Sequence, residues 1–321
     1  MRSFLKKHIN PMSSEFRLEI YGCRGSTPVS GERYTRYGGA TSCVRVTVAG
    51  REIILDAGSG LALLGRHLVK RRLRDGQPVH AYFFLSHVHL DHITGLPYFA
   101  PNYFEDATIW MMGPRNMRFP SFEATIDNFM APPFFPVPRY EMGAEFHFSD
   151  ICEADTVFFL RDQRAPIQLR AGHPRHQAAM PPAASVETRV ECLRGYNHPK
   201  SGVNIYKIVS GGKTLVYATD TEGFVHGDRR LIEFARGADV LIHDAMYSEE
   251  RYTAGRAATQ GFGHSTIQIA TDLANAAGVG KLLLFHHDPA NDDDTLDQLE
   301  ARGKARFAET QMARQGMVLD I

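Results

Sequence analysis

The chain has 321 residues, 43% of them hydrophobic, and its 36 Lys and Arg residues balance its 36 Asp and Glu residues. This length and apolar content suffice for a large buried core. The zero net charge gives no overall positive field of the kind that drives nonspecific nucleic-acid binding. No window approaches the roughly 18 apolar residues of a membrane span, and the basic N-terminal stretch lacks the apolar core of a signal peptide.

Cysteine usage points to a reducing compartment. Cys23, Cys43, Cys152 and Cys192 are scattered along the chain without C-x-x-C spacing. In a chain of this size such residues are expected to be free, reduced thiols. We therefore expect a cytoplasmic protein that does not contact a membrane.

The first half of the chain predicts strands followed by helices. Apolar runs predict strands at 16–21, 43–49, 52–55, 81–86 and 107–112. Residues 59–73 carry apolar side chains at helical spacing and a basic last turn, which suits a helix C-terminus. A second helix is predicted at 121–130, with Ser121 as its N-cap.

The second half returns to this pattern after a less regular segment. Residues 131–187 contain APPFFPVP and a stretch rich in Pro and Ala, which predicts irregular structure. Beyond it, strands are predicted at 188–193, 203–209, 214–219, 239–245 and 281–285, and helices at 228–236, 265–277 and 293–314. This order favours two mixed β-sheets packed together with helices outside. We expect one domain, residues 1–321, with halves at roughly 16–150 and 188–321.

The stretch LSHVHLDHITG at 85–95 is the most informative part of the sequence. It places His87, His89, Asp91 and His92 within six residues. A His-x-His pair at a strand end directs both imidazoles to one side, because strand side chains alternate. Imidazole and carboxylate together favour Zn, Mn or Fe over Ca or Mg. A solvated polar loop is the alternative, but four such groups beneath an apolar strand would need compensation for lost hydration.

This stretch resembles the H-x-H-x-D-H signature of the metallo-β-lactamase superfamily. The other motifs of that family have counterparts in the same order over residues 56–286: Asp56 in IILDAGSG, His198 in YNHPKSG, Asp220 in LVYATDTE, and a histidine in LLLFHHDP. The resemblance implies an α/β fold, namely an αββα four-layer sandwich of two mixed sheets. It also implies a metal-dependent hydrolase.

The resemblance further implies two divalent metal ions, with zinc first and manganese or iron as alternatives. Seven residues would supply the ligands: His87, His89 and His198 for one ion, Asp91, His92 and His286 for the other, and Asp220 bridging both. Asp56 would lie outside the ligand set and orient ligands. Strand alternation and the family pattern favour His286 over its neighbour His287 as the ligand.

Three features resemble the phosphodiesterase branch of this superfamily, which includes the tRNA 3′-processing enzyme RNase Z. Residues 261–289 are similar to its GHST block, whose histidine assists the leaving group; this role would fall to His264. A departing alkoxide needs a proton, and an imidazole can supply it near neutral pH. Asp220 stands where the namesake β-lactamases have a cysteine.

The third feature is LIHDAMY at 241–247, which resembles a strand end of the same branch. His243 is expected to be a packing or outer histidine rather than a ligand. Asp244 would hold His264 in the correct tautomer. The alternative is that His264 is a structural residue bonded to Asp244 beside a helix start.

Two loops allow alternative interpretations. Gly25, Ser26 and Thr27 could present backbone N–H groups to an anionic substrate, or they could form a structural turn. Arg24 and Arg36 are either phosphate contacts or ordinary surface residues.

A second pair of histidines, His173 and His176, suggests a third metal ion. Histidines in exposed loops usually bind nothing, and we favour that interpretation here.

The expected reaction is hydrolysis of a small phosphodiester or nucleotide. A hydroxide bridging two ions about 3.5–4 Å apart would attack phosphorus in line. Asp91 and Asp56 would support the centre, and His264 would protonate the leaving group. Because the net charge is zero and no arm rich in Gly and basic residues is present, we expect tRNA not to be the substrate. The resemblance is also compatible with a homodimer.

Two other functions share this cluster. A carbon-ester or thioester hydrolase, similar to glyoxalase II or a lactonase, would not need the GHST block. A di-iron protein for oxygen chemistry or sensing would use the same imidazole–carboxylate cage.

Overall fold

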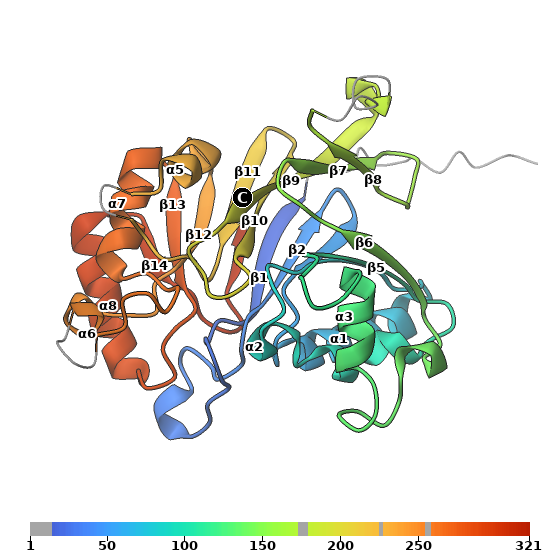
Figure 1. Ribbon diagram of the computed structural model, residues 1–321, viewed down its shortest axis with the longest axis horizontal. Coiled ribbons are helices and arrows are strands. Elements are labelled where there is room, and N and C mark those ends of the chain that lie inside the picture. Colours follow the sequence, from blue (N-terminus) through green and yellow to red (C-terminus); the bar gives the residue numbers. More distant parts are fainter. Residues whose placement is uncertain (1–14, 173–178, 225–226, 254–257) are drawn as a thin grey trace, which may run out of the picture.

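The computed structural model describes residues 15–172, 179–224, 227–253 and 258–321, and its strands form two sheets (Figure 1). His173 and His176 lie outside these residues. The first sheet consists of β1 (Phe16–Gly22), β2 (Cys43–Val48), β3 (Arg51–Leu55), β4 (His80–Phe84), β5 (Thr108–Gly113), β6 (Glu145–Asp150) and β15 (Val318–Asp320). The second consists of β7 (Asp155–Leu160), β8 (Ile167–Arg170), β9 (Val186–Gly195), β10 (Val203–Ser210), β11 (Lys213–Ala218), β12 (Val240–Asp244), β13 (Lys281–Phe285) and β14 (Thr310–Met312).

Each sheet is mixed, with a parallel block beside antiparallel strands. The first sheet has the order β15-β1-β2-β3-β4-β5-β6, and the second has the order β14-β13-β12-β11-β10-β9-β7-β8. Strands β3 to β6 pair in parallel in the first sheet, as do β11 to β14 in the second. The carboxyl ends of each parallel block therefore meet along one edge, where ligands bind in α/β folds.

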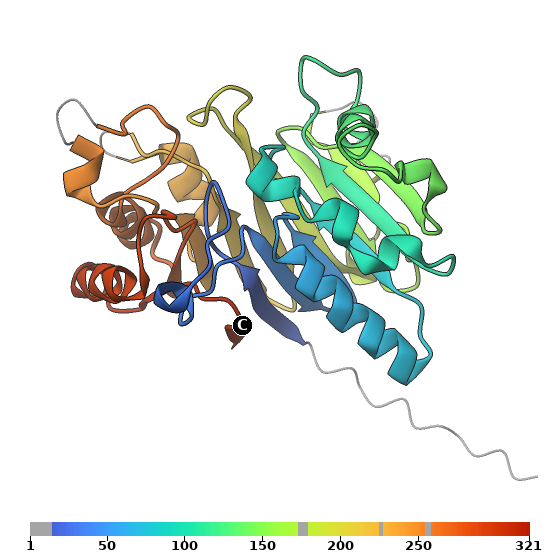
Figure 2. The same ribbon diagram turned by 90° about the horizontal axis from the view of Figure 1, so that it is seen from below.

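Helices cover the outer faces of both sheets, which gives four layers (Figures 1 and 2). On the first sheet lie α1 (Leu61–Asp75) and α3 (Phe122–Phe129), and on the second lie α5 (Arg229–Ala235), α7 (Ile267–Ala277) and α8 (Asp293–Arg306). The remaining helices are short: α2 (Leu90–Ile93), α6 (Glu249–Thr253), and the 3-10 turns η1 (Glu32–Tyr34), η2 (Leu96–Tyr98), η3 (Ala100–Tyr103), η4 (Arg139–Glu141) and η5 (Ala183–Ser185). The predicted αββα sandwich is confirmed.

The hydrophobic core consists of three clusters, one between the two sheets and one between each sheet and its helices. Alternate residues of β4 show the division, because Tyr82 and Phe84 belong to the cluster between the sheets, whereas Ala81 and Phe83 belong to the cluster beneath α1. A third buried cluster lies between the second sheet and its helices. Strands buried on both faces read as continuous apolar runs, as AYFF does here.

Helix ends follow ordinary capping chemistry. The Ser121 side chain accepts a hydrogen bond from the Ala124 N–H, as the N-cap prediction requires. Thr266 caps α7 in the same way, and Gly278 ends that helix in a left-handed conformation.

Two predictions about secondary structure are wrong. Residues 131–187 are not simply irregular, because they contain β6, β7 and β8. β7 pairs with β9 and buries Val157 and Phe159 between the sheets. Its sequence DTVFFL is typical of a strand, and the prediction missed it by judging the segment on its overall Pro and Ala content. The helix predicted at 293–314 ends at Arg306, because the chain turns so that β14 can pair with β13.

The four cysteines all lie within the described residues, and none forms a disulfide. Among the described residues, no helix combines the length and the apolar character that a membrane crossing requires.

Candidate metal centre

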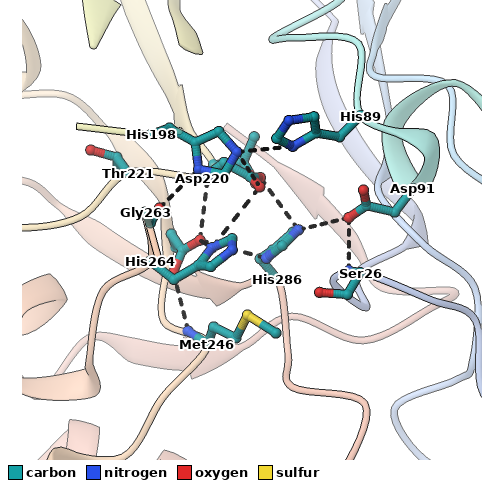
Figure 3. A network of polar contacts seen from close by, with 12 residues as sticks. Ser26, His89, Asp91, His198, Asp220, Thr221, Met246, Gly263, His264 and His286 are labelled. Carbon is teal, nitrogen blue, oxygen red and sulfur yellow. Dashed lines mark hydrogen bonds and ion pairs between the residues drawn. The ribbon is translucent and has the colours of Figure 1, made fainter. Parts of the chain in front are cut away.

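The predicted ligands come together where strand ends of both sheets converge (Figure 3). Asp56 directly follows β3, Asp220 follows β11 after Thr219, and His286 directly follows β13. Their φ angles are 59°, 50° and 63°. Such left-handed conformations cost roughly 1–3 kcal/mol in a non-glycine residue and persist only where the surroundings enforce them. The same backbone turn thus directs three side chains into one site.

The first ligand group consists of His87, His89 and His198. His198 Nε2 lies 3.1 Å from His89 Nδ1, and the rings of His87 and His198 are 4.7 Å apart. One nitrogen of each ring lies within 4.8 Å of the others. His87 and His198 are buried, whereas His89 is exposed, so this group is open on the His89 side.

The second group consists of Asp91, His92, Asp220 and His286, and it is tighter. His92 Nε2 lies 3.2 Å from Asp91 Oδ2 and 3.2 Å from Asp220 Oδ2. His286 Nε2 lies 3.1 Å and 3.3 Å from the same two oxygens. A tetrahedral ion with ligands at about 2.0–2.1 Å requires ligand separations of roughly 3.3–3.4 Å. The separations between these atoms are therefore close to those that tetrahedral coordination of a zinc-like ion requires.

Asp220 faces both groups with different oxygens. Its Oδ2 belongs to the second group, while its Oδ1 lies 3.7 Å from His87 Nε2 and 3.7 Å from His198 Nε2. The side chain is only 2% exposed. A single buried carboxylate thus stands between the two ligand groups.

Asp56 orients the centre from outside the ligand groups. Its buried carboxylate accepts hydrogen bonds from the Ser86 N–H at 2.7 Å, the Ser86 hydroxyl at 2.8 Å and the Tyr217 hydroxyl at 2.7 Å. It also lies 2.8 Å from His92 Nδ1, which leaves His92 Nε2 facing the second group. Such outer contacts fix the tautomer and direction of ligating imidazoles.

Sequence reasoning missed three of these outer contacts. The Ser86 hydroxyl lies 3.0 Å from His87 Nδ1, and the carbonyl of Gly263 lies 3.1 Å from His198 Nδ1. Ser86 directly precedes the histidine cluster, so its position was a usable signal. Gly263 belongs to the GHST block, but that pattern does not indicate its contact with His198. Tyr217 meets the site only through tertiary structure.

The protonation of His87 and His198 suits the first group. Burial and the neighbouring His92 hold the pKa of His87 well below its usual range, and burial lowers the pKa of His198 to about 4. Neutral imidazoles are the form that binds metals. His87 Nε2 is buried and has no hydrogen-bond partner among the described residues. Such an unpaired buried nitrogen calls for a ligand.

The second group favours positive charge. Burial would lower the pKa of His92, but Asp220, Asp91 and Asp56 raise it well above its usual range. Burial would likewise raise the pKa of Asp220, but His286, His92 and His87 hold it well below its usual range. The carboxylates are therefore ionised and attract a cation. The donor sets of both groups fit divalent metal ions that accept nitrogen and oxygen ligands.

His264 lies against the second group (Figure 3). Its ring stacks on that of His286 with centroids 4.9 Å apart, and its Nδ1 lies 2.8 Å from Asp244 Oδ2. Burial lowers the pKa of His264, but Asp244, Asp220 and Asp91 outweigh burial and raise it to about 9. No described residue hydrogen-bonds to its Nε2, which leaves that nitrogen available.

Asp244 holds several parts of the centre together. Its Oδ2 accepts from the backbone N–H of Asp220 at 3.1 Å, and its Oδ1 accepts from the N–H groups of Met246 and Ser265 at 3.1 Å and 2.9 Å. The side chain is fully buried. It therefore fixes His264 relative to Asp220.

Two further histidines point away from the ligand groups. His287 Nε2 lies 2.6 Å from the Ala313 carbonyl, so this ring forms a wall while His286 enters the second group. His243 Nδ1 lies 2.7 Å from the Asp244 carbonyl, and the ring is buried. His243 packs in the second sheet and belongs to neither group.

The loop at 24–27 is structural. Its N–H groups are engaged within the protein: Gly25 N–H donates to the His287 carbonyl at 3.0 Å, and Ser26 N–H donates to Asp91 Oδ2 at 2.7 Å. Thr27 N–H donates to the Gly25 carbonyl. The idea that these groups bind an anionic substrate is therefore wrong, and Ser26 instead holds Asp91 in place.

Neither arginine near this loop is free to bind phosphate. Arg24 is fully buried and donates to the carbonyls of Gly38 at 2.9 Å and Asn291 at 2.6 Å. Arg36 is half exposed and pairs with Asp297 and Asp294 of α8.

Solved structures with this fold are similar along nearly the whole chain. The metallo-β-lactamase fold protein YhfI from Bacillus subtilis is 19% identical, with a TM-score of 0.64 and coverage of 96% of this chain and 100% of that one. Human tRNase Z, short form, is 18% identical, with a TM-score of 0.58 and coverage of 95% and 99%. These likenesses confirm the fold.

Curated relatives are named Ribonuclease Z. The protein from Geobacillus kaustophilus is 27% identical over 262 residues, which cover 72% of this chain and 78% of that protein. The protein from Brevibacillus brevis is 34% identical over 107 residues, which span 32% of this chain and only 31% of that protein. These names overturn the expectation that tRNA is not a substrate. The expectation rested on the lack of an arm rich in Gly and basic residues and on net charge, which is a property of the whole chain and does not describe the surface around a site.

A family model described as the beta-lactamase superfamily domain matches residues 51–287, which include all the candidate ligand residues. The match covers well over half of the 321 residues. With the fold and the ordered motifs, it identifies the chain as a member of the metallo-β-lactamase superfamily.

Proposed function

We propose that this protein is a metal-dependent hydrolase of phosphodiester bonds. The observation that carries the proposal is the His264–Asp244 pair, at 2.8 Å, beside the carboxylate of Asp220 that faces both ligand groups. Hydrolysis of a carbon ester or a thioester needs the two ligand groups but not this additional imidazole. The curated relatives named Ribonuclease Z support the same reaction class.

In this proposal His87, His89 and His198 would hold one divalent ion, Asp91, His92 and His286 would hold the other, and Asp220 would serve both. Zinc is the first candidate, with manganese and iron as alternatives. When bound, such ions lower the pKa of a water molecule and offset the charge that develops on the phosphoryl oxygens. The side chains of the protein determine where such ions would bind.

Outer residues keep the ligand atoms directed inward. Asp56 holds His92 by Nδ1, the Gly263 carbonyl faces Nδ1 of His198, and Ser26 N–H donates to Asp91. The first two contacts engage ring nitrogens that point away from the centre, and the third fixes a carboxylate. The positions of the ligand atoms are therefore set before metal or substrate binds. Such preorganisation avoids reorganisation during the reaction.

His264 is the proposed general acid. Asp244 holds it by Nδ1, so Nε2 is the nitrogen that can give a proton to the departing alkoxide oxygen. The alternative is a structural role, in which His264 only packs on His286. The two roles predict different results when the imidazole is removed. Loss of a general acid slows only substrates whose leaving group needs a proton, whereas loss of a structural residue slows all substrates.

The substrate class is a phosphodiester with a nucleoside or polynucleotide on at least one side. Precursor tRNA belongs among the first substrates to be tested, given the names of the relatives. Bis(p-nitrophenyl) phosphate is a useful second substrate, because its leaving group needs no proton.

The test joins metal analysis to hydrolysis with and without a chelator. We expect about two equivalents of Zn or Mn per chain and chelator-sensitive cleavage of bis(p-nitrophenyl) phosphate. Two equivalents of iron with no cleavage of any diester would refute the proposal and favour the di-iron alternative. Cleavage of thioesters or lactones alone would favour the carbon-ester alternative.

The acid assignment has its own test in the His264→Asn variant. Metal content should stay near that of the wild type, because this residue is not a proposed ligand. Cleavage of an RNA phosphodiester should fall by about 10²–10⁴-fold, and cleavage of bis(p-nitrophenyl) phosphate should fall much less. Equal losses on both substrates would show that His264 acts only through structure. Tyr140→Ala is the control, because Tyr140 is 82% exposed and its turn is anchored to α3 through Arg139.

A further inference from the structure

A cavity of about 590 Å³ opens beside the first ligand group. Residues 196–202, residues 222–224 and Gly261 line it. His198 is part of its wall, so the cavity adjoins the proposed metal centre. Its volume lies within the range of pockets that bind small molecules such as a nucleotide.

Two exposed aromatic rings line this cavity. Tyr196 is 69% exposed and Phe224 is 56% exposed. Both rings come from loops that follow strands of the second sheet, Tyr196 directly after β9 and Phe224 beyond the end of β11. Aromatic rings contribute little to stability where they remain this exposed, since apolar area stabilises only when it is buried.

Tyr196 is nevertheless held in place. Its hydroxyl donates to Glu153 Oε2 at 2.9 Å, and the Arg230 guanidinium lies 5.7 Å from the ring centroid. Arg230 also donates to the Arg194 carbonyl and pairs with Glu153. Because Arg230 does not line the cavity, the part of the ring that faces the cavity is free of this contact. A fixed ring with a free side is suited to stacking.

One basic side chain in the lining is available to contact an anionic group. Lys200 lies in its wall, and no described residue forms a salt bridge with Lys200. The carboxylate of Glu222 is engaged by the Tyr252 hydroxyl and by the N–H groups of Gly261 and Gly263, at 2.5–2.9 Å. The one acidic side chain in the lining is therefore used to hold the loop that carries Gly263.

We propose that Tyr196 and Phe224 form a subsite that stacks a nucleobase of the substrate, with Lys200 contacting a phosphate next to the base. This inference rests on the proposed function and adds a binding site to it. Base–aromatic stacking tolerates any sequence because every base has a π face, and it is worth about 1–3 kcal/mol per base. The cleaved phosphate would lie at the metal centre, and the adjacent nucleoside would extend past His198 into the cavity.

The test measures binding by calorimetry, so that it does not depend on turnover. The ligands are adenosine 5′-monophosphate, adenosine 3′-monophosphate and methyl phosphate, each titrated into the metal-loaded protein. We expect at least one nucleotide to bind at least about 10-fold more tightly than methyl phosphate. Tyr196→Ala and Phe224→Ala should each weaken that nucleotide by roughly 5- to 150-fold and leave methyl phosphate unchanged.

Matched variants separate stacking from structure. Tyr196→Phe keeps the ring and should keep the preference for the nucleotide, although it loses the bond to Glu153. Tyr140→Ala removes an exposed ring elsewhere and should change nothing. Lys200→Gln should weaken adenosine 3′,5′-bisphosphate more than either monophosphate.

The outcomes distinguish this inference from the proposed function. Equal affinity for both nucleotides and methyl phosphate, or unchanged affinity in both alanine variants, would overturn the subsite even if diesters are cleaved. A nucleotide preference that both alanine variants lose would support the subsite even if no diester is cleaved, in which case the proposed function alone fails.

Discussion

Gly25 packs so closely on His286 that one added methyl group should disturb the second ligand group. A Cβ atom at this position would lie 2.5 Å from Cε1 and 2.5 Å from Nδ1 of the His286 ring. Carbon atoms normally approach to about 3.5–4.0 Å, so the conflict is roughly 1 Å. Gly25 is not among the glycines with positive φ, so Gly25→Ala tests this contact rather than backbone strain.

Neither side of this contact can move without cost to the site. If the ring moves, His286 Nε2 leaves its positions 3.1 Å from Asp91 and 3.3 Å from Asp220. If the loop moves, it loses the 2.7 Å bond from Ser26 N–H to Asp91. Ligand distances must hold within about 0.2 Å for a metal site. Either response should weaken metal binding in the second group.

The assay is metal analysis combined with competition against a chromophoric chelator. In Gly25→Ala we expect one of the two metal equivalents to bind about 10–100-fold more weakly, and the other to bind as in the wild type. Thr27→Ala is the control, because Thr27 lies in the same loop and its side chain is exposed. Circular dichroism should show that both variants keep the native fold. Two equivalents bound with unchanged affinity in Gly25→Ala would refute the reasoning.

Three further predictions concern buried polar groups. Asp220→Asn should weaken binding of both metal equivalents by more than about 100-fold, because the carboxylate faces both ligand groups. Retention of one equivalent on metal analysis would argue against bridging. Tyr217→Phe should lower the free energy of unfolding of the metal-free protein by about 1.5–3 kcal/mol, because the hydroxyl donates to the Asp56 carboxylate at 2.7 Å; a urea midpoint equal to that of the wild type would contradict this. Arg24→Met should cost about 3–5 kcal/mol in the same assay, because it removes a fully buried cation beside Asp293; Arg36→Met, at a half-exposed position, should cost less than about 1 kcal/mol.

His87, His89, Asp91 and His92 could be singled out from the sequence because their spacing is local, at one strand end and in the turn after it. His198, Asp220 and His286 were predicted from the resemblance to the metallo-β-lactamase superfamily, whose motifs recur in order along the chain. The structure brings these residues together with His198 and His286. Strand alternation and the family pattern together favoured His286 over His287, whose ring faces the Ala313 carbonyl.

Other features could not be predicted, because they depend on contacts between distant segments. β7 is an exception, because its sequence DTVFFL is itself typical of a strand. It was missed because the Pro and Ala content of residues 131–187 as a whole was given more weight. The N–H groups of Gly25 and Ser26 looked available until the structure showed partners 262 and 65 residues away along the chain, at His287 and Asp91. Tyr217 reaches Asp56 across the two packed sheets and leaves no local pattern. Gly263 lies in the GHST block, but its contact with His198, 65 residues away, could not be predicted from that block.

Asp244 fixes the position of the proposed acid, His264, relative to the proposed bridging ligand, Asp220. One of its oxygens accepts from the N–H of Asp220 and lies 2.8 Å from His264 Nδ1, and the other accepts from Ser265 N–H. A shift of the loop that carries His264 would therefore also disturb the turn that carries Asp220. The geometry required for protonating a leaving group is thus coupled to the geometry required for holding two metal ions. Such coupling has no use in a site that needs only a metal-activated water, and for this reason we favour phosphodiester hydrolysis over ester hydrolysis.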